Sequence, residues 1–173
     1  MHLRRAALAT TAVLSVALLA PVTTAQASTP LRVAYTCKIA TIFTPDPFAM
    51  PVDATLTAVR EGATVRLGLS MGKPVLPVDS EFEATLTSSL KATANGAATT
   101  LTGAGTVVLK PNTPVNLPVL KSSVTTTATS LAFIPGALTV TVATADGAVA
   151  SNCTPDAATS VAVPVTGPSV TPT

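Results

Sequence analysis

The chain has 173 residues and is poor in charge, since 10% of them are Asp, Glu, Lys or Arg and 47% are hydrophobic. Its formal net charge of +2 includes Arg4 and Arg5, so the remaining basic and acidic residues are equal in number, and we expect no nucleic-acid partner. The single histidine is His2, which excludes Ser-His-Asp catalysis, Cys-His catalysis and an imidazole zinc site in the rest of the chain.

Residues 1–27 have the three parts of a secretory signal peptide. Met1–Arg5 is a short basic start, Ala6–Ala20 is an apolar run, and Ala-Gln-Ala ending at Ala27 fits the small residues of a cleavage site. The apolar run is shorter than the about 20 residues that a transmembrane helix needs. We therefore expect cleavage after Ala27, no transmembrane segment in the mature protein and a secreted, extracellular location. Loose association with the cell envelope stays open.

Leu31–Lys38 is the first predicted strand, because apolar residues alternate with polar or small ones and Cys37 lies near its end. The second cysteine, Cys153, ends the last alternating hairpin. An exported chain meets no cytosolic reducing system, so the two cysteines indicate a disulfide. On the chain-entropy model, closing a loop of this length removes about 5 kcal/mol of unfolded-state entropy. The bridge would tie the first strand to the last, and a crossing between two sheets is one possible arrangement.

The next segment, Ile39–Pro51, contains three prolines and is predicted to be a loop. Val52–Val59 and Val65–Leu69 then alternate on either side of a turn at Glu61-Gly62, which predicts a hairpin.

Phe82–Lys91 keeps a two-residue period and leads into the turn Asn95-Gly96, in which both residues tolerate positive φ. The following strand is Thr99–Leu109, and its two glycines, Gly103 and Gly105, predict a bulge.

Lys110–Pro118 is a proline-rich crossing loop, after which Val119–Phe133 is predicted to be extended. Leu138–Val142 and Val149–Cys153 form the clearest hairpin, with its turn at Asp146-Gly147.

The mature chain shows no apolar stripe of helical period with caps. We therefore predict an all-β fold, an immunoglobulin-like antiparallel β-sandwich of about seven to nine strands with one disulfide. Residues 28–155 would form the single domain. Residues 156–173 are rich in Pro, Thr and Val and are predicted to be an extended C-terminal tail.

Three features resemble a known family: the opening Tyr35-Thr36-Cys37, the alternating strands from Val52, and the closing hairpin that ends at Cys153. With these, residues 31–155 resemble an uncharacterised family of actinobacterial secreted immunoglobulin-like domains of unknown function. The resemblance implies the fold and the location. It implies no activity.

One string has a catalytic pattern. Ser70-Met71-Gly72-Lys73 matches the SxxK motif of penicillin-binding enzymes, in which serine and lysine lie one helical turn apart. Gly72 and Pro74 disfavour a helix here, and the companion motifs are absent. We interpret the string as a turn that leaves a strand.

The acidic residues Asp79, Glu81 and Glu83 alternate along one predicted strand face. Same-face neighbours lie about 7 Å apart, near glycosidase carboxylate separations, but carboxylates on one strand do not flank a bond from two sides. Calcium ligation by these residues stays open. Charges that keep a strand from pairing with a neighbour are the ordinary interpretation. We predict no catalytic residue, no metal site and no cofactor.

These observations favour a secreted, non-catalytic structural or binding module that contacts another extracellular protein or a cell-wall polymer through loops or edge strands. The proline-rich segments Pro45–Pro51 and Lys110–Pro118 are the candidate recognition surfaces. One alternative is a carrier of a small apolar ligand, because the composition resembles that of immunoglobulin-like carriers of enediyne antibiotics, although those have two disulfides. Another is a protease inhibitor that uses the loop Lys110–Lys121.

Overall fold

The computed structural model describes residues 27–40, 46–76 and 78–167, so the predicted signal peptide lies outside the described residues apart from Ala27. Within these ranges every regular element is a β-strand, which confirms the all-β prediction and its strand number. The nine strands are β1 (Ser28–Ala40), β2 (Phe48–Glu61), β3 (Thr64–Met71), β4 (Phe82–Ala94), β5 (Ala97–Leu109), β6 (Leu120–Thr125), β7 (Ser130–Thr144), β8 (Gly147–Pro155) and β9 (Val161–Thr166).

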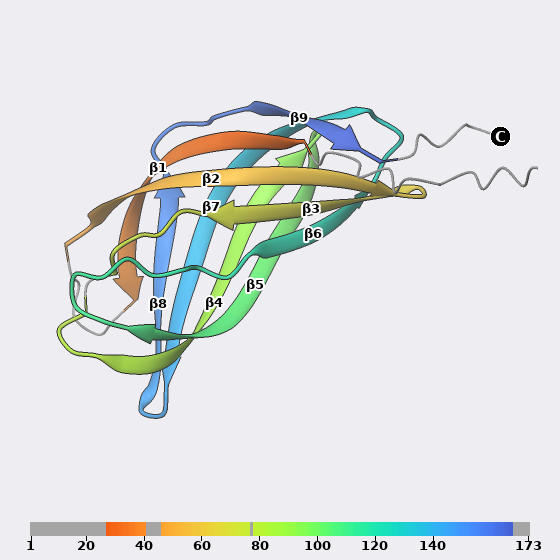
Figure 1. Cartoon of the computed structure of the whole chain (residues 1–173). Helices are drawn as coiled ribbons and strands as arrows, with labels where there is room; N and C mark the ends of the chain where they lie inside the picture. The colour runs from red at the N-terminus through yellow and green to blue at the C-terminus, as the bar shows by residue number, and fades with distance from the viewer. Residues whose placement is uncertain (1–26, 41–45, 77, 168–173) are drawn as a thin grey trace, which may run out of the picture.

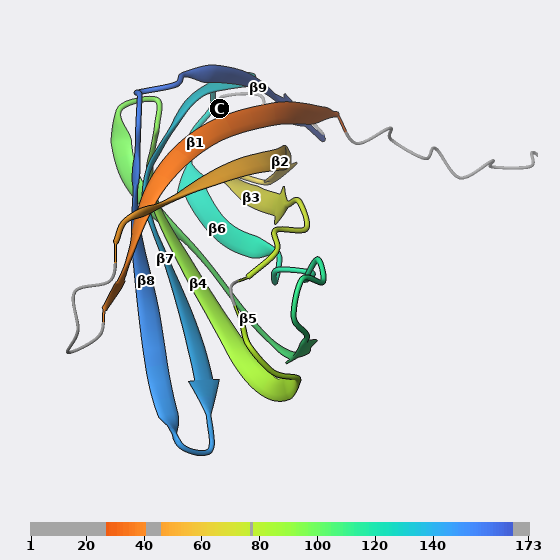
Figure 2. The same ribbon diagram turned by 90° about the vertical axis from the view of Figure 1, so that its left-hand side faces the viewer.

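The nine strands form one hydrogen-bonded sheet in the order β1-β8-β7-β4-β5-β6-β3-β2-β9. Additional pairings of β1 with β2 and of β7 with β9 turn this sheet back on itself. The result is two facing layers, β1, β2, β3 and β6 on one side and β4, β5, β7 and β8 on the other, whose strands cross at a steep angle (Figures 1 and 2). Every pairing is antiparallel except that of β2 with β9, which is parallel.

The three predicted hairpins are present, and each has a two-residue loop. Their strands close at the register pairs Glu61↔Thr64, Ala94↔Ala97 and Thr144↔Gly147. In the central hairpin Asn95 and Gly96 have φ values of 51° and 81°, the left-handed conformation that these two residue types accept most readily. The central turn is the predicted Asn95-Gly96, whereas the other two loops, Gly62-Ala63 and Ala145-Asp146, are each displaced by one residue from the predicted turns.

The predicted loop Ile39–Pro51 is shorter than expected. β1 continues to Ala40 and β2 already begins at Phe48, while residues 41–45 lie outside the described ranges. Pro51 is tolerated inside β2 because it pairs with Ala34 of β1 on one side, whereas β3 joins β2 on the other side only from Ala54 onward.

The bulge predicted at Gly103 and Gly105 is wrong, since the register of β4 with β5 runs without a shift. Position 103 requires a glycine for another reason, because a Cβ here would lie 2.5 Å from the backbone oxygen of Val119. The register shift occurs instead between β4 and β7, between Leu90 and Ala92. A glycine in a strand thus marks a close backbone approach here.

The extended run predicted for Val119–Phe133 is divided into β6 and the start of β7. The predicted tail needs a larger correction, because Val161–Thr166 forms β9 and pairs with both β2 and β7. Val163 of β9 is fully buried. The boundary predicted at residue 155 is therefore too early, since the sheet extends to Thr166.

The disulfide joins Cys37 and Cys153, which confirms the predicted pair. The two residues face each other on the neighbouring strands β1 and β8, with 3.9 Å between their Cα atoms. The bridge therefore does not cross the interior between two separate sheets. It joins hydrogen-bonded neighbours of one sheet, at the edge where the two layers meet. The bridge still links positions 116 residues apart in the sequence.

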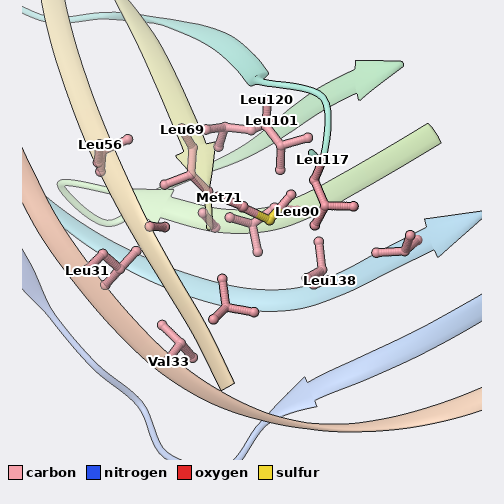
Figure 3. Packing of buried hydrophobic residues seen from close by; sticks show 14 of the residues in the cluster. Leu31, Val33, Leu56, Leu69, Met71, Leu90, Leu101, Leu117, Leu120 and Leu138 are labelled. Atoms are coloured by element: carbon pink, nitrogen blue, oxygen red, sulfur yellow. The ribbon is translucent and has the colours of Figure 1, made fainter. Parts of the chain in front are cut away.

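The core consists mainly of aliphatic side chains that project from both layers toward each other, with Phe133 also fully buried. Figure 3 shows Leu56, Leu69 and Met71 above Leu90 and Leu138. Tyr35 also lies between the layers, and its hydroxyl donates a hydrogen bond to the backbone oxygen of Gly136 on β7 at 3.2 Å. Burial raises the pKa of Tyr35 from its ordinary value of 10.0 to about 12.

Candidate functional site

An apolar pocket of about 460 Å³ opens between the layers at the β7–β8 end of the sandwich. Figure 2 shows the β7–β8 hairpin projecting at this end. The inner faces of β7 and β8 supply one wall. The register pairs Val140↔Ser151 and Val142↔Val149 place these four residues side by side. Side chains two residues apart on a strand face the same way, so this wall is a continuous ribbon surface.

The second wall comes from the start of β2 and the end of β1. Phe48 and Met50 alternate along β2, and Ile39 contributes from β1. Phe48 is the register partner of Cys37, whose other neighbour on the sheet is Cys153. The disulfide therefore connects the two walls at their base, and Cys153 lines the pocket.

The third wall is built by the two proline-rich connections. Leu76 and Val78 come from the segment before β4, and Leu117 comes from the segment before β6. The two segments are tied together, since the backbone N–H of Val115 donates to the oxygen of Pro74 at 2.9 Å. Phe82, the first residue of β4, completes this wall.

The apolar side chains that line the pocket remain partly exposed to solvent. Val149 is 45% exposed although it lines the pocket, and Phe48, Leu76 and Phe82 are half-buried. In a protein core, by contrast, apolar side chains are normally packed as densely as in crystals of small organic molecules. Grouped apolar side chains around an open cavity are typical of binding sites for small molecules.

Polar groups are few in the described lining of this pocket. Asp146, in the β7–β8 turn, is its only charged residue. The Thr144 hydroxyl is used within that turn, where it accepts from the N–H of Asp146 and donates to the oxygen of Gly147, both at 3.3 Å. Ser151 is half-buried on the β8 wall, and no hydrogen bond of its hydroxyl is found within the described part of the chain.

The SxxK residues do not reach this pocket. Ser70 is exposed near the end of β3, where it pairs with Thr55 of β2, and Lys73 follows the strand on an exposed stretch. The helical turn that aligns serine and lysine in penicillin-binding enzymes is therefore not formed. The arrangement that lets a lysine activate the serine nucleophile in those enzymes is therefore not present at Ser70 and Lys73.

The three acidic residues are dispersed. Asp79 and Glu81 precede β4, so only Glu83 lies on the outer face of that strand, which corrects the prediction of one shared strand face. Glu81 pairs with Lys110 at 3.1 Å, with both side chains about half exposed. Among the residues with described positions, no group of three or more His, Cys, Asp or Glu side chains could hold a metal ion.

Of the two predicted recognition surfaces, Pro45–Pro51 is only partly described, but its last residues belong to β2. Lys110–Pro118 is an irregular connection, as expected, yet it also contributes Leu117 to the pocket. Sequence reasoning missed Leu76, Val78 and Leu117 as pocket residues. The available signal was an apolar side chain directly beside a proline, since a purely solvent-exposed loop has little reason to carry one.

No helical segment in residues 27–40, 46–76 and 78–167 has the length and apolar character needed to cross a membrane. Comparison with protein-family models, with curated proteins and with solved structures gives no match.

Proposed function

We propose that the mature chain is an extracellular, non-catalytic binding module that takes a small apolar ligand into the pocket at the β7–β8 end. The observation that supports this best is the pocket itself, about 460 Å³ with an almost entirely apolar described lining. Ligand sites of drug-sized molecules are typically about 300–1,000 Å³ and mainly apolar. Between the two binding modes predicted from the sequence, this geometry favours the small-ligand carrier over a surface contact.

The energetic basis is the removal of apolar surface from water. Each Å² of apolar surface that the ligand and the pocket wall bury together contributes about 25 cal/mol. The wall residues that gain cover are the ones now partly exposed, above all Val149 at 45%. A ligand thus completes packing that the chain leaves open at this end.

The absence of catalysis is part of the proposal. Asp146 is the only charged group in the described lining, and Ser151 has no lysine or histidine beside it there. A serine without a general base is a weak nucleophile. The extracellular location rests on the predicted signal peptide and on the disulfide, which oxidising compartments favour. The resemblance to secreted actinobacterial domains agrees with this location.

A second binding mode has one specific observation in its favour. β5 pairs with β6 at a single position, Thr102↔Lys121, so in the described part of the chain its residues from 103 onward have β4 as their only ladder neighbour. Such an edge can accept an extended segment of another extracellular protein. This mode would use the outer margin of the sandwich and leave the pocket unused.

The proposed function is tested with the exported protein, purified from culture medium, and with Nile red, an uncharged apolar dye whose emission rises in apolar surroundings. Titration should show saturable binding at one site. Val149→Trp should weaken binding at least tenfold, because the indole would occupy the pocket. The matched control is Val119→Trp, since Val119 is also 45% exposed but lies outside this pocket. No saturable binding, or equal losses in both variants, would refute the proposal.

A further inference from the structure

We infer that the ligand is an uncharged, largely apolar molecule with one hydrogen-bonding group, such as a hydroxyl or a carbonyl, that meets the hydroxyl of Ser151. This inference rests on the proposed function and assigns the chemistry of the ligand. It follows from the few polar groups in the pocket, from their positions and from the absence of a cation in its described lining.

Ser151 is placed to act as the polar contact. It lies on the β8 wall directly opposite Val140, with Cys153 and Val149 as its same-face neighbours. Its hydroxyl is thus surrounded by apolar side chains. The other hydroxyl in the lining, that of Thr144, is used by the β7–β8 turn. A polar group in such surroundings favours a ligand that completes its hydrogen bonds.

An anionic ligand is disfavoured in either orientation. If the carboxylate of such a ligand lay at Ser151, it would lose its hydration against an apolar wall, and the described lining has no lysine or arginine to compensate for that loss. With its charged group at the hairpin tip, it would meet the carboxylate of Asp146. Fatty-acid carboxylates are therefore poor ligands, whereas the matching alcohols fit both ends of the pocket.

The alcohol and the acid of one chain length provide the test. Isothermal titration calorimetry of the exported protein should give a dissociation constant for decanol at least about tenfold lower than that for decanoate at neutral pH. Ser151→Ala should weaken decanol binding about fivefold through the lost hydrogen bond. Ser151→Thr keeps a hydroxyl and should restore most of the affinity.

Ser70→Ala is the control, because Ser70 is exposed on β3 and lies outside this pocket. Thermal melts of every variant show whether it is folded, and the threonine variant keeps the test informative if the alanine variant is not. Equal affinities for decanol and decanoate, or an unchanged affinity in folded Ser151→Ala, would overturn the inference. In that case Nile red binding sensitive to Val149→Trp would still support the proposed function, whereas its absence would remove both.

Discussion

The two ends of β2 differ in how the chain completes its interior. At one end Phe48 is half-buried and lines an open apolar pocket. At the other end the inward residue is Arg60, which is 5% exposed and donates through Nη1 to the backbone oxygen of Thr126 at 2.6 Å. Its Nη2 donates to the backbone oxygen of Ala128. One end leaves apolar groups without cover, and the other buries a guanidinium that donates to two backbone oxygens.

β9 closes the Arg60 end. Its Val163 is fully buried, the N–H of Val165 donates to the oxygen of Thr129 at 2.9 Å, and the Thr166 hydroxyl donates to the oxygen of Ala58 at 3.2 Å. Figure 1 shows β9 at this side of the molecule, where it pairs with the last part of β2 and with the start of β7. Backbone groups and apolar surface are thus covered together.

The contrast indicates that the open end serves binding and that the closed end serves stability. Binding surfaces are commonly drawn from the less stable part of a fold, because they leave apolar area to be covered by the ligand. A closed end whose apolar surface and backbone groups are covered can support such an opening. Changes at the closed end should therefore alter stability more than binding, and changes at the open end should do the reverse, with the disulfide affecting both.

The largest effect is expected for the disulfide. The double variant Cys37→Ala/Cys153→Ala should lose about 5 kcal/mol of unfolding free energy on the chain-entropy model. Its melting temperature should fall by about 10 °C or more. Nile red binding should weaken as well, because the bridge connects two pocket walls and Cys153 lines the pocket. Chemical denaturation and dye titration measure the two effects, and a loss below about 1 kcal/mol would contradict this role.

Removal of the buried guanidinium should produce the next largest loss. Arg60→Met keeps the length of the side chain but leaves two backbone oxygens without their charged donor, which should cost about 3 kcal/mol. Dye binding by the folded variant should stay within about twofold of the wild-type value, because Arg60 lies at the far end of β2 from Phe48. Urea unfolding monitored by circular dichroism is the measurement.

Arg66→Met is the matched control for Arg60. Arg66 pairs with Glu61 at 2.8 Å, but the side chains are 69% and 49% exposed, so the pair should contribute less than about 1 kcal/mol. Equal losses in the two variants would show that burial of the Arg60 end has no special energetic role, and the comparison between the ends would fail.

The two ends also differ in how well sequence predicts them. Two-residue alternation and turn residues predicted the hairpins because each depends on neighbours in the sequence. The same alternation extends from Ala58 to the next inward position, Arg60, but a charged side chain is rarely buried, so the pattern alone does not predict its burial. Its carbonyl partners come from the connection between β6 and β7, far along the chain, so no local pattern could identify them.

The errors at the C-terminus and in the pocket have the same physical origin. β9 has a composition typical of a tail, and it forms a strand because β2 and β7 present backbone partners to it. The pocket likewise depends on two connections that come together through the bridge Val75↔Pro114. Both are tertiary effects, whereas the disulfide was predictable from the chemistry of two cysteines in a chain that is predicted to be exported.

Between the ends, Tyr35 gives a smaller, pH-dependent effect. Its folded-state pKa of about 12 exceeds the ordinary value of 10.0, because burial disfavours the phenolate. The contribution of Tyr35 to the unfolding free energy is fully present below pH 10 and is lost as the pH rises from 10 toward 12. At pH 11 the loss is about 1 kcal/mol. Tyr35→Phe should remove this contribution and lose the hydrogen bond to Gly136 at neutral pH. Urea unfolding from pH 8 to 11 measures the difference between the two proteins, and an identical pH dependence would disprove it.

The smallest effect on stability should come from the open end, and this makes it the sharpest comparison. Val149→Thr exchanges a methyl group for a hydroxyl of similar size, with both residues favourable in strands. Because Val149 is 45% exposed, the hydroxyl keeps contact with water, and the unfolding free energy should change by less than about 0.5 kcal/mol. The same exchange in β9, Val163→Thr, places a hydroxyl at a fully buried position and should cost about 2 kcal/mol. Dye binding should reverse the order, with a loss of several-fold for Val149→Thr and almost none for folded Val163→Thr. If the two variants lost equal stability, Val149 would be packed like a core residue, and the pocket would have no uncovered wall for a ligand to complete.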